Sequence, residues 1–377
     1  MTAQNDAPEQ VLLNDFRAQW AAHGPGLVEA FSRVGASGWL VLGQEVTAFE
    51  RALADHVGLP FAVGVGNGLD ALEIALRVHG IGPGATVITT PLTAFATTLA
   101  IVRAGARPLF VDVDASGLLD LDEVERVLRA RRDVRALMPV HLFGHAADVG
   151  RLESLAAAHG VVLVEDCAQA IGARSGGRPV GAGSPLSATS FYPTKNLGAM
   201  GDGGAVFART EELRARAAAV RDYGQSARYV HDTLGMNSRL DEVQAALLRS
   251  VLLPDLGPAT ERRRAIADRY RREIRSPHVE LVPVPEKSES VWHLFPVLVR
   301  GDRERFRAAL AAKGIQSGVH YPTLTSDQRA LEGVDFVREG DLPRARDFAA
   351  REVSLPMHRY LTDEQVTRVI VACNAFE

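Results

Sequence analysis

Short apolar runs alternate with amphipathic segments as far as residue 253, and this alternation constrains the fold more than any other feature. Short apolar runs predict buried strands, and the amphipathic segments between them predict helices. We expect strands at residues 61–65, 86–90, 108–113, 135–140, 161–165, 188–191 and 205–208, and helices at 69–79, 121–131, 149–159, 211–221 and 240–252. Such alternation is typical of βαβ units, so the sequence predicts an α/β fold built on a large, mostly parallel sheet.

The pattern changes after Leu253. Pro254, Gly257 and Pro258 precede an arginine-rich segment that predicts a helix. The segments that follow predict a helix at 261–274, a strand at 293–299 and helices at 303–313 and 363–374. We therefore predict a large domain over residues 1–255 and a smaller α/β domain over residues 256–377.

Composition argues against several classes of protein. The net charge is −4, with 42 basic and 46 acidic residues, whereas a nucleic-acid-binding protein usually has a basic face. No apolar run approaches the roughly 18 residues of a membrane helix. Residues 1–10 are polar and lack the basic and apolar regions of a signal peptide. The two cysteines, Cys167 and Cys373, are typical of reduced core residues. These features predict a cytoplasmic protein.

Lysine is rare in this chain. Only Lys195, Lys287 and Lys313 occur among the 42 basic residues, and the others are arginines. Arginine stays protonated and cannot form an imine under ordinary conditions, so chemistry that needs an amine requires lysine. Lys287 and Lys313 are expected at the surface, which leaves Lys195 as the candidate for such chemistry.

Residues suited to ligand binding follow the predicted strands. The turn Gly66-Asn67-Gly68-Leu69 follows strand 61–65, and Asp166 follows strand 161–165. Ser190 and Lys195 lie at and after the end of a third strand, and a glycine-rich stretch, 198–204, comes next. In α/β folds, ligands bind at the carboxyl ends of the strands, so these residues are expected to share one edge of the sheet.

This set of residues is suited to pyridoxal phosphate. That cofactor needs an amine to form an imine, a carboxylate near its ring nitrogen, donors for its phosphate and an apolar face against its ring. The candidates are Lys195, Asp166, the 66–69 turn with Ser190, and Phe95. Each has an ordinary alternative when taken alone: a cap or metal ligand for Asp166, a tight turn at 66–69, a cap for Ser190 and a core position for Phe95. Their order along the chain favours the cofactor site.

Two other patterns have simpler explanations. His141 and His145 have a spacing that some metal sites use, but no third ligand cluster accompanies them. We therefore expect a strand-end loop near the cofactor and no metal. The arginine runs 262–264 and 271–272 predict a solvated helix face.

The motifs together resemble a known family, the sugar aminotransferases of the DegT/DnrJ/EryC1/StrS group, which are fold-type I PLP-dependent enzymes. The resemblance runs nearly end to end. The motifs that carry it are GVGNGLDAL (64–72), EDCAQA (165–170), SFYPTKNLG (190–198), GDGGA (201–205), NSRLDEVQAA (237–246), WHLF (292–295) and HYP (320–322).

The resemblance implies roles for the cofactor-binding residues. Lys195 would form the imine and move the proton between cofactor and substrate. Asp166 would pair with the ring nitrogen, and Gln169 would hydrogen-bond the ring hydroxyl. The phosphate would be held by Ser190 and the amides of Gly68 and Leu69, and Phe95 would stack on the ring. Asn237 would reach the phosphate in the partner subunit, which implies a homodimer with shared active sites.

The resemblance also implies a substrate. Tyr192, His320 and Tyr321 would line a sugar pocket, and Arg228 would lie against a nucleotide diphosphate. The Gly-Asn-Gly-x-Asp-Ala-Leu form is most similar to members that aminate C3 of dTDP-3-keto-6-deoxyhexoses. The chain departs from several of them at Ile171, where they have a histidine, and at residues 323–326, which lack the usual proline and histidine.

The predicted reaction is transfer of an amino group from L-glutamate to a nucleotide-linked ketosugar, as in deoxyaminosugar and natural product biosynthesis. Arg239 is a candidate for binding the glutamate carboxylate, with a structural salt bridge as the alternative. Other candidate substrates are a C4 ketosugar and a cyclitol ketone. A non-catalytic regulatory relative is a further alternative, against which the presence of Lys195 argues.

Overall fold

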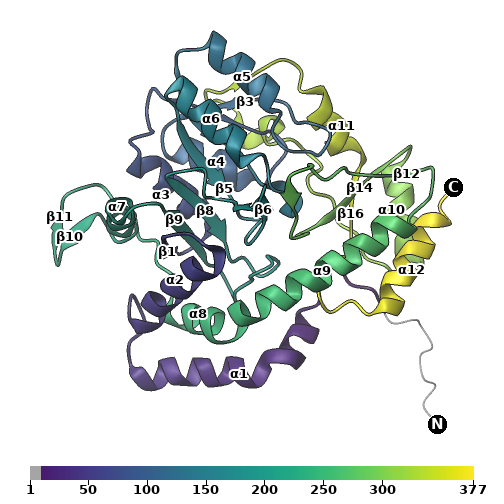
Figure 1. Cartoon of the computed structure of the whole chain (residues 1–377), viewed down its shortest axis with the longest axis horizontal. Coiled ribbons are helices and arrows are strands. Elements are labelled where there is room, and N and C mark those ends of the chain that lie inside the picture. The colour runs from purple at the N-terminus through teal and green to yellow at the C-terminus, as the bar shows by residue number, and fades with distance from the viewer. Residues whose placement is uncertain (1–9) are drawn as a thin grey trace.

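The structure is a computed structural model that describes residues 10–377 (Figure 1). The prediction that no signal peptide is present concerns residues 1–10, so it falls almost wholly outside the described residues. Across residues 10–377, no helix has both the length and the apolar character that crossing a membrane requires. The cytoplasmic location expected from the sequence stays a prediction.

An eight-stranded sheet forms the centre of the molecule, in the order β1-β9-β8-β5-β4-β2-β3-β15. The strands are β1 (Phe61–Val65), β2 (Thr86–Thr89), β3 (Arg107–Phe110), β4 (Val134–Met138), β5 (Val162–Asp166), β8 (Leu186–Ser190), β9 (Gly204–Ala208) and β15 (Val337–Arg338). The pairings of β9 with β1 and β8 are antiparallel, and the others in this sheet are parallel. The predicted mostly parallel α/β sheet is confirmed, with strand ends shifted by a few residues.

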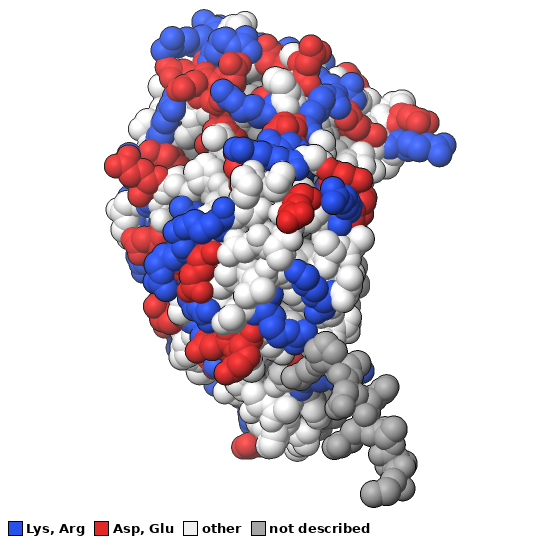
Figure 2. Space-filling model, turned by 90° about the vertical axis from the view of Figure 1, so that its right-hand side faces the viewer, with Lys and Arg blue, Asp and Glu red and all other residues white. Residues whose placement is uncertain are grey.

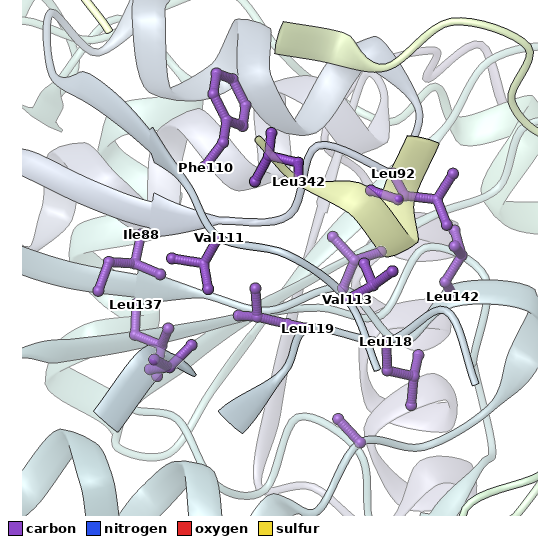
Figure 3. Packing of buried hydrophobic residues seen from close by; sticks show 14 of the residues in the cluster. Ile88, Leu92, Phe110, Val111, Val113, Leu118, Leu119, Leu137, Leu142 and Leu342 are labelled. Carbon is purple, nitrogen blue, oxygen red and sulfur yellow. The ribbon is translucent and has the colours of Figure 1, made fainter. Parts of the chain in front are cut away.

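Helices cover both faces of the sheet, because successive strand residues point to opposite sides. Val87 packs with helices α3 (Gly68–Val78) and α7 (Glu211–Arg221) on one face. Its neighbour Ile88 and the adjacent Leu137 pack on the other face (Figure 3). Helices α5 (Leu121–Ala130) and α6 (Val149–His159) cover that face. The strands are therefore apolar on both sides, and several appear in the sequence as short continuous apolar runs.

A second, antiparallel sheet lies near the C-terminus. It has the order β12-β14-β16, formed by β12 (Val279–Leu281), β14 (Phe295–Val299) and β16 (Glu352–Leu355). The helices α10 (Arg303–Ala312) and α12 (Asp363–Asn374) share its core with the long helix α9 (Leu253–Glu273). Both cysteines are buried and unpaired.

Helix α9 begins eight residues before the predicted start at residue 261. Pro254 and Pro258 predicted a start after them, but proline is compatible with a first helical turn, where the backbone N–H groups lack intrahelical partners. Pro254 lies in that first turn, and Pro258 lies within the helix. The predicted helix 240–252 is instead α8 (Glu242–Leu247) followed by a π-helical turn, Leu248–Leu252. The predicted boundary at 255/256 falls within α9, and the division into two domains stays a prediction.

The arginine run at 262–264 corrects another expectation. Arg262 and Arg264 form ion pairs near the surface, as a solvated helix face requires. Arg263 is buried, and its guanidinium donates to the carbonyl oxygens of Trp292, His293 and Met357 at 2.6–3.3 Å. A charged run thus includes one residue that faces inward. Elsewhere, positive and negative side chains are interspersed on the face shown in Figure 2.

Two N-terminal helices, α1 (Phe16–Ser37) and α2 (Gln44–Val57), pack with α8 beside β1 and β9. The residue before α2 is Gly43, which has no side chain to cap the helix. The buried carboxylate of Glu242 accepts hydrogen bonds from the backbone N–H groups of Gly43, Glu45 and Val46 at 2.8–2.9 Å. A side chain from α8 therefore caps α2, which joins the two helices.

We predict that Glu242→Ala lowers the free energy of unfolding by about 3 kcal/mol, because three N–H groups lose their acceptor. Glu242→Gln keeps one oxygen for Gly43 and Val46 and should be less damaging. Chemical denaturation of both variants measures the difference. Equal stability of the alanine variant and the wild type would contradict the cap.

Candidate active site

The carboxyl ends of β5 and β8 meet the start of α3 at one edge of the large sheet. Asp166 is the last residue of β5, and Ser190 is the last residue of the neighbouring strand β8. Helix α3 begins at Gly68, whose Cα carries no side chain. A Cβ at that position would lie 2.7 Å from the Cβ of Ser190. Glycine therefore allows the helix end to approach the strand end.

Gly204, the first residue of β9, completes this close approach. A Cβ there would lie 2.5 Å from the backbone carbon of Asn67. The N–H groups of Gly68 and Leu69 are in the first turn of α3, where intrahelical acceptors are lacking. The side chain of Ser190 lies beside them. Backbone donors at a helix N-terminus together with a hydroxyl can bind a phosphate group.

Asp166 is buried, with 4% of its surface exposed. Its carboxylate accepts hydrogen bonds from the hydroxyl of Thr97 at 2.8 Å and from the N–H of Ala168 at 3.0 Å. Because the first of these protons is donated, the Thr97 hydroxyl accepts from Thr93, 3.1 Å away. Burial raises the pKa of Asp166, and the two hydrogen bonds and the charge of Lys195 lower it in part. A cation close to this carboxylate would relieve the cost of its burial.

Lys195 lies in the loop after β8, with its N–H donating to the carbonyl of Tyr192 at 2.8 Å. Its side chain is partly exposed, yet the surrounding protein lowers the pKa of its amine to about 8 through desolvation. The charge of Asp166 acts in the opposite direction and raises this pKa. The amine is therefore neutral far more often at neutral pH than an ordinary lysine, and a neutral amine is nucleophilic.

Gln169 and Tyr321 join the large sheet to the C-terminal part of the chain. Gln169 accepts from the N–H of Phe143 at 2.7 Å and donates to the hydroxyl of Tyr321 at 3.1 Å. One N–H of the Gln169 amide is left for a ligand. Phe95, the first residue of α4 (Phe95–Arg103), is half-buried against the core that contains Leu92.

His320 is electrostatically coupled to Lys195. Burial lowers the pKa of His320 to about 4, and the charge of Lys195 lowers it further. The same two causes hold the pKa of buried His293 well below its usual value. Both imidazoles are therefore neutral at physiological pH. The structure thus brings Lys195, Asp166 and His320 into one electrostatic environment.

Three predicted site residues have exposed side chains in the single chain. Tyr192 is 53% exposed, and Asn237 is also exposed. Arg228 lies between β10 (Gln225–Ala227) and β11 (Val230–His231), in a hairpin that projects from the body of the molecule (Figure 1). Its guanidinium lies over the ring of Tyr229, 5.1 Å from the centroid.

Arg239, the candidate for the glutamate carboxylate, forms an ion pair with Asp222 at 3.0 Å. The structure therefore favours the salt-bridge alternative for this residue.

The two histidines that had raised the question of a metal have other partners. His141 accepts from the N–H of Ala147 through Nδ1, so its Nε2 carries the proton that is donated to Glu165 at 2.9 Å. His145 pairs with Ser290 at 2.9 Å and contacts Trp292 edge-on. Within the described part of the chain, no group of three or more histidine, cysteine, aspartate or glutamate side chains is placed to hold a metal ion.

Thr97 donates a hydrogen bond to the buried Asp166 and was not among the predicted site residues. The residue lies two positions after Phe95, in a threonine-rich segment that follows the end of β2. Polar residues at that end of a parallel strand would have been the signal.

The residues present fit pyridoxal phosphate. The buried Asp166 has only neutral hydrogen-bond donors and is suited to a cationic ring nitrogen. The α3 N-terminus with Ser190 is suited to a phosphate, and Lys195 supplies an amine of lowered pKa. The cationic ring nitrogen, the anionic phosphate and the aldehyde carbonyl of the cofactor each have a complementary protein group at this edge of the sheet.

Comparison with known proteins agrees with this geometry. Residues 24–374 match the model of the DegT/DnrJ/EryC1/StrS aminotransferase family. The dTDP-3-amino-3,4,6-trideoxy-alpha-D-glucose transaminase of Streptomyces venezuelae is 42% identical over 99% of this chain and 97% of its own length. The crystal structure of S. venezuelae DesV has a TM-score of 0.93 and 42% identity, covering 97% of this chain and 98% of that one.

A third similarity concerns the cofactor. The sugar aminotransferase Spr1654 of Streptococcus pneumoniae, named as putative and solved in its PLP form, has a TM-score of 0.84 and 27% identity. It covers 92% of this chain and 95% of its own. The family match covers nearly the whole chain, the fold is shared, and the polar groups at the sheet edge fit the cofactor. The chain belongs to the DegT/DnrJ/EryC1/StrS aminotransferase family and is a sugar aminotransferase that uses pyridoxal 5′-phosphate.

Proposed function

We propose that this enzyme transfers the amino group of L-glutamate to C3 of a nucleotide-linked ketosugar, a dTDP-3-keto-6-deoxyhexose, in deoxyaminosugar biosynthesis. The observation that carries the transamination is the amine of Lys195, whose pKa desolvation lowers to about 8, in the field of the buried Asp166. The sugar and the carbon follow from the similarity to the S. venezuelae transaminase, whose name describes a 3-amino sugar linked to dTDP.

The cofactor would be held by residues on several elements. Ser190 and the N–H groups of Gly68 and Leu69 would bind its phosphate, and Asp166 would hold a positive charge at its ring nitrogen. Gln169 would donate its remaining N–H to the ring hydroxyl. Phe95 would supply an apolar face for the ring. When bound, the cofactor supplies an electron sink for the charge that develops as a substrate carbon loses a proton.

Lys195 moves the proton. With a pKa of about 8, its Nζ is neutral in roughly a tenth of molecules at pH 7, and the neutral form can accept a proton from the substrate carbon and return one to a neighbouring atom. Asp166 stays close enough to raise the pKa of Nζ, which keeps the protonated form accessible for the return step. Thr97 holds the carboxylate of Asp166 in place through its hydroxyl.

The pocket for the ketosugar would be formed by Tyr192, His320 and Tyr321. Tyr321 is fixed by its hydrogen bond from Gln169, and His320 presents a neutral imidazole. Arg228 supplies a positive charge for the nucleotide diphosphate. Because Arg228 lies on the projecting β10–β11 hairpin, we propose that it acts on the site of a second subunit.

We propose a homodimer with shared active sites, which an exposed apolar surface supports. Phe16, Trp20, Val28 and Phe31 lie on α1 at a spacing that places them on one helix face, and each is about half exposed or more. Trp39 and Leu40, just after the end of α1, are also 63% and 59% exposed. Large exposed apolar patches usually mark interfaces between proteins. Asn237 would cross this interface to the phosphate in the partner subunit.

We predict that the purified enzyme aminates a dTDP-3-keto-6-deoxyhexose when supplied with L-glutamate, with the product detected by mass spectrometry. Lys195→Ala should lower the rate by roughly 10⁴-fold or more, because the proton carrier is lost. Lys287→Ala is the matched control, since Lys287 is an exposed lysine paired with Asp148. Turnover of only a C4 ketosugar or a cyclitol ketone would refute the assigned substrate, and wild-type rates in Lys195→Ala would refute the mechanism.

A second prediction concerns Thr97. Thr97→Val removes a hydrogen bond to the Asp166 carboxylate and should lower kcat by roughly 10- to 100-fold. Thr97→Ser restores the hydroxyl and should recover most of the rate. The pair is compared by steady-state kinetics at fixed cofactor saturation. Equal rates in the valine and serine variants would show that the hydroxyl has no part in the reaction.

A third prediction tests the shared site. Lys195→Ala and Asn237→Ala homodimers are each expected to be impaired. After subunit exchange, a mixed dimer contains one site with both native residues if Asn237 serves the partner subunit. The mixture should then regain activity toward half of the wild-type value per mixed dimer. If both residues act within one subunit, mixing restores nothing.

A further inference from the structure

Strand β16 places two polar residues beside His320. Glu352 and Ser354 are two positions apart, so their side chains lie on the same side of the strand. Both are fully buried. The strand is fixed on one side by β14 and on the other by the antiparallel bridge between Ser354 and Gly318. Two buried polar groups in a small apolar core require a partner, and His320 supplies it.

A continuous chain of hydrogen bonds joins the carboxyl group to the imidazole. The N–H of His320 donates to Oε2 of Glu352 at 2.6 Å. Oε1 of Glu352 lies 2.6 Å from Oγ of Ser354, and that Oγ lies 2.8 Å from Nδ1 of His320. A Cβ at Gly318 would lie 2.8 Å from Cε1 of His320. The imidazole therefore lies against backbone that only glycine leaves open.

Nε2 is the other nitrogen of this ring, and it has no hydrogen-bond partner among residues 10–377. The side chain of His320 is partly exposed, and the charge of Lys195 acts on its ring. Nε2 is thus the ring atom available to a ligand in the environment of Lys195. Whether it donates or accepts depends on the proton at Nδ1.

The serine hydroxyl has one proton, and this allows two arrangements of the chain. With Glu352 ionised, Ser354 donates to the carboxylate and accepts from Nδ1–H, which leaves Nε2 as an acceptor. With Glu352 protonated, the acid donates to Ser354, Ser354 donates to Nδ1, and Nε2 carries the proton as a donor. Each arrangement keeps the hydrogen bonds from Glu352 through Ser354 to Nδ1 and leaves only Nε2 without a partner.

We propose that Glu352 and Ser354 are positioning residues that set the tautomer of His320, so that one proton at the buried carboxyl decides whether Nε2 donates or accepts a hydrogen bond. The part of this inference that concerns the sugar rests on the proposed function: Nε2 would bind an oxygen of the ketosugar. As a donor, Nε2 suits a carbonyl oxygen, which can only accept.

The change between the two arrangements is balanced in protons. One proton enters at Nε2 of His320, the proton on Nδ1 passes to Oγ of Ser354, and the serine proton passes to Oε1 of Glu352. The same transfers in reverse order release the proton from Nε2. No electrons are exchanged, and only N–H and O–H bonds form and break.

The electrostatic environment places this change near physiological pH. Burial raises the pKa of Glu352 to about 8, and the hydrogen bonds from Ser354 and His320 lower it in part. Arg303 and Arg307 of α10 also lower it. Because the pKa of His320 is about 4, its ring remains neutral while Glu352 titrates. The other titratable groups facing this chain are Tyr321, Lys195 and His293.

The sign of the pH dependence follows. Below pH 8, Glu352 is protonated and Nε2 is a donor. As pH rises through about 8, the carboxyl group ionises and Nε2 becomes an acceptor. Glu352→Gln imitates the protonated acid, because its amide donates to Ser354 while its oxygen still accepts from the N–H of His320. This variant should therefore hold Nε2 in the donor form at every pH.

The first test is ¹⁵N NMR of the holoenzyme labelled in its histidines, with His320→Gln used to assign the signals. Between about pH 6 and pH 10, Nδ1 and Nε2 of His320 should exchange their protonated and unprotonated shifts with a midpoint near 8. In Glu352→Gln, the Nε2–H form should persist throughout. A wild-type ring that keeps one tautomer across this range, or a Glu352→Gln ring that switches as the wild type does, would overturn the proposal.

The second test is the pH profile of KM for the ketosugar. In the wild type, KM should rise roughly three- to tenfold above pH 8, the effect of one lost hydrogen bond. The rise should vanish in Glu352→Gln. Ser354→Ala breaks the link between Glu352 and Nδ1, so its KM should not vary as Glu352 titrates, and Ser354→Thr should restore the wild-type profile. The glutamate half-reaction should be alike in wild type and Glu352→Gln, which separates this effect from the titration of Lys195.

The two tests separate failure of this inference from failure of the proposed function. The NMR result does not depend on which ketone is the substrate. A tautomer switch in an enzyme that aminates no ketosugar would support the role of Glu352 and refute the proposed function. Amination of the ketosugar with the same KM profile in wild type and Glu352→Gln would leave the proposed function intact and refute the sugar contact of Nε2.

Discussion

The carboxylate of Asp166 is buried at the end of β5 with only neutral hydrogen-bond donors around it, and the active site is organised around that unbalanced charge. Its neighbour Glu165 is also fully buried but has a complete set of donors in His141, Gly181 and Ser184. Although burial raises the pKa of Glu165, these donors give it a net lowering, whereas the pKa of Asp166 is raised. Two adjacent acids on one strand therefore differ in how far the protein compensates their negative charge. Glu165 is satisfied by the fold, and Asp166 is left for a cationic ligand.

The surrounding elements place further ligand-binding groups next to the carboxylate of Asp166. The close contacts at Gly68 and Gly204 bring the α3 N-terminus to the same edge of the sheet, where it can bind an anion. Lys195 reaches this edge from the loop after β8, and desolvation keeps its amine reactive. The α3 N-terminus, the carboxylate of Asp166 and the amine of Lys195 therefore meet at one edge of the sheet, although they come from three separate chain segments. The C-terminal part of the chain adds His320 and Tyr321, which are suited to recognition of a second molecule.

Much of this arrangement could be predicted from sequence because it is local. Short apolar runs indicated where the strands lie. Asp166, Ser190 and the 66–69 turn were predicted from their positions at strand ends. Contacts between distant segments could not be predicted in this way. Glu242 caps a helix almost two hundred residues earlier in the chain, and Glu352 contacts a histidine through the packing of a separate sheet. Arg263 was misassigned because a charged run has no signal for the one member that faces inward. Asn237 and Arg228 are exposed in the single chain, and the roles given to them rest on the proposed dimer.

The pairing of β15 with β3 has a mechanical consequence. β15 comes from the C-terminal part of the chain yet adds a parallel strand to the edge of the large sheet, while α9 runs continuously beneath both parts. A rigid rotation of the C-terminal sheet would have to break that edge pairing and bend a helix of 21 residues. The large sheet and the C-terminal part of the chain are therefore joined at two places, by an edge strand and by a continuous helix. Under the proposed function, in which His320 and Tyr321 contact the sugar, substitutions in the short loop 318–322 should alter the spectrum of accepted ketones more readily than changes at the junction of the two sheets.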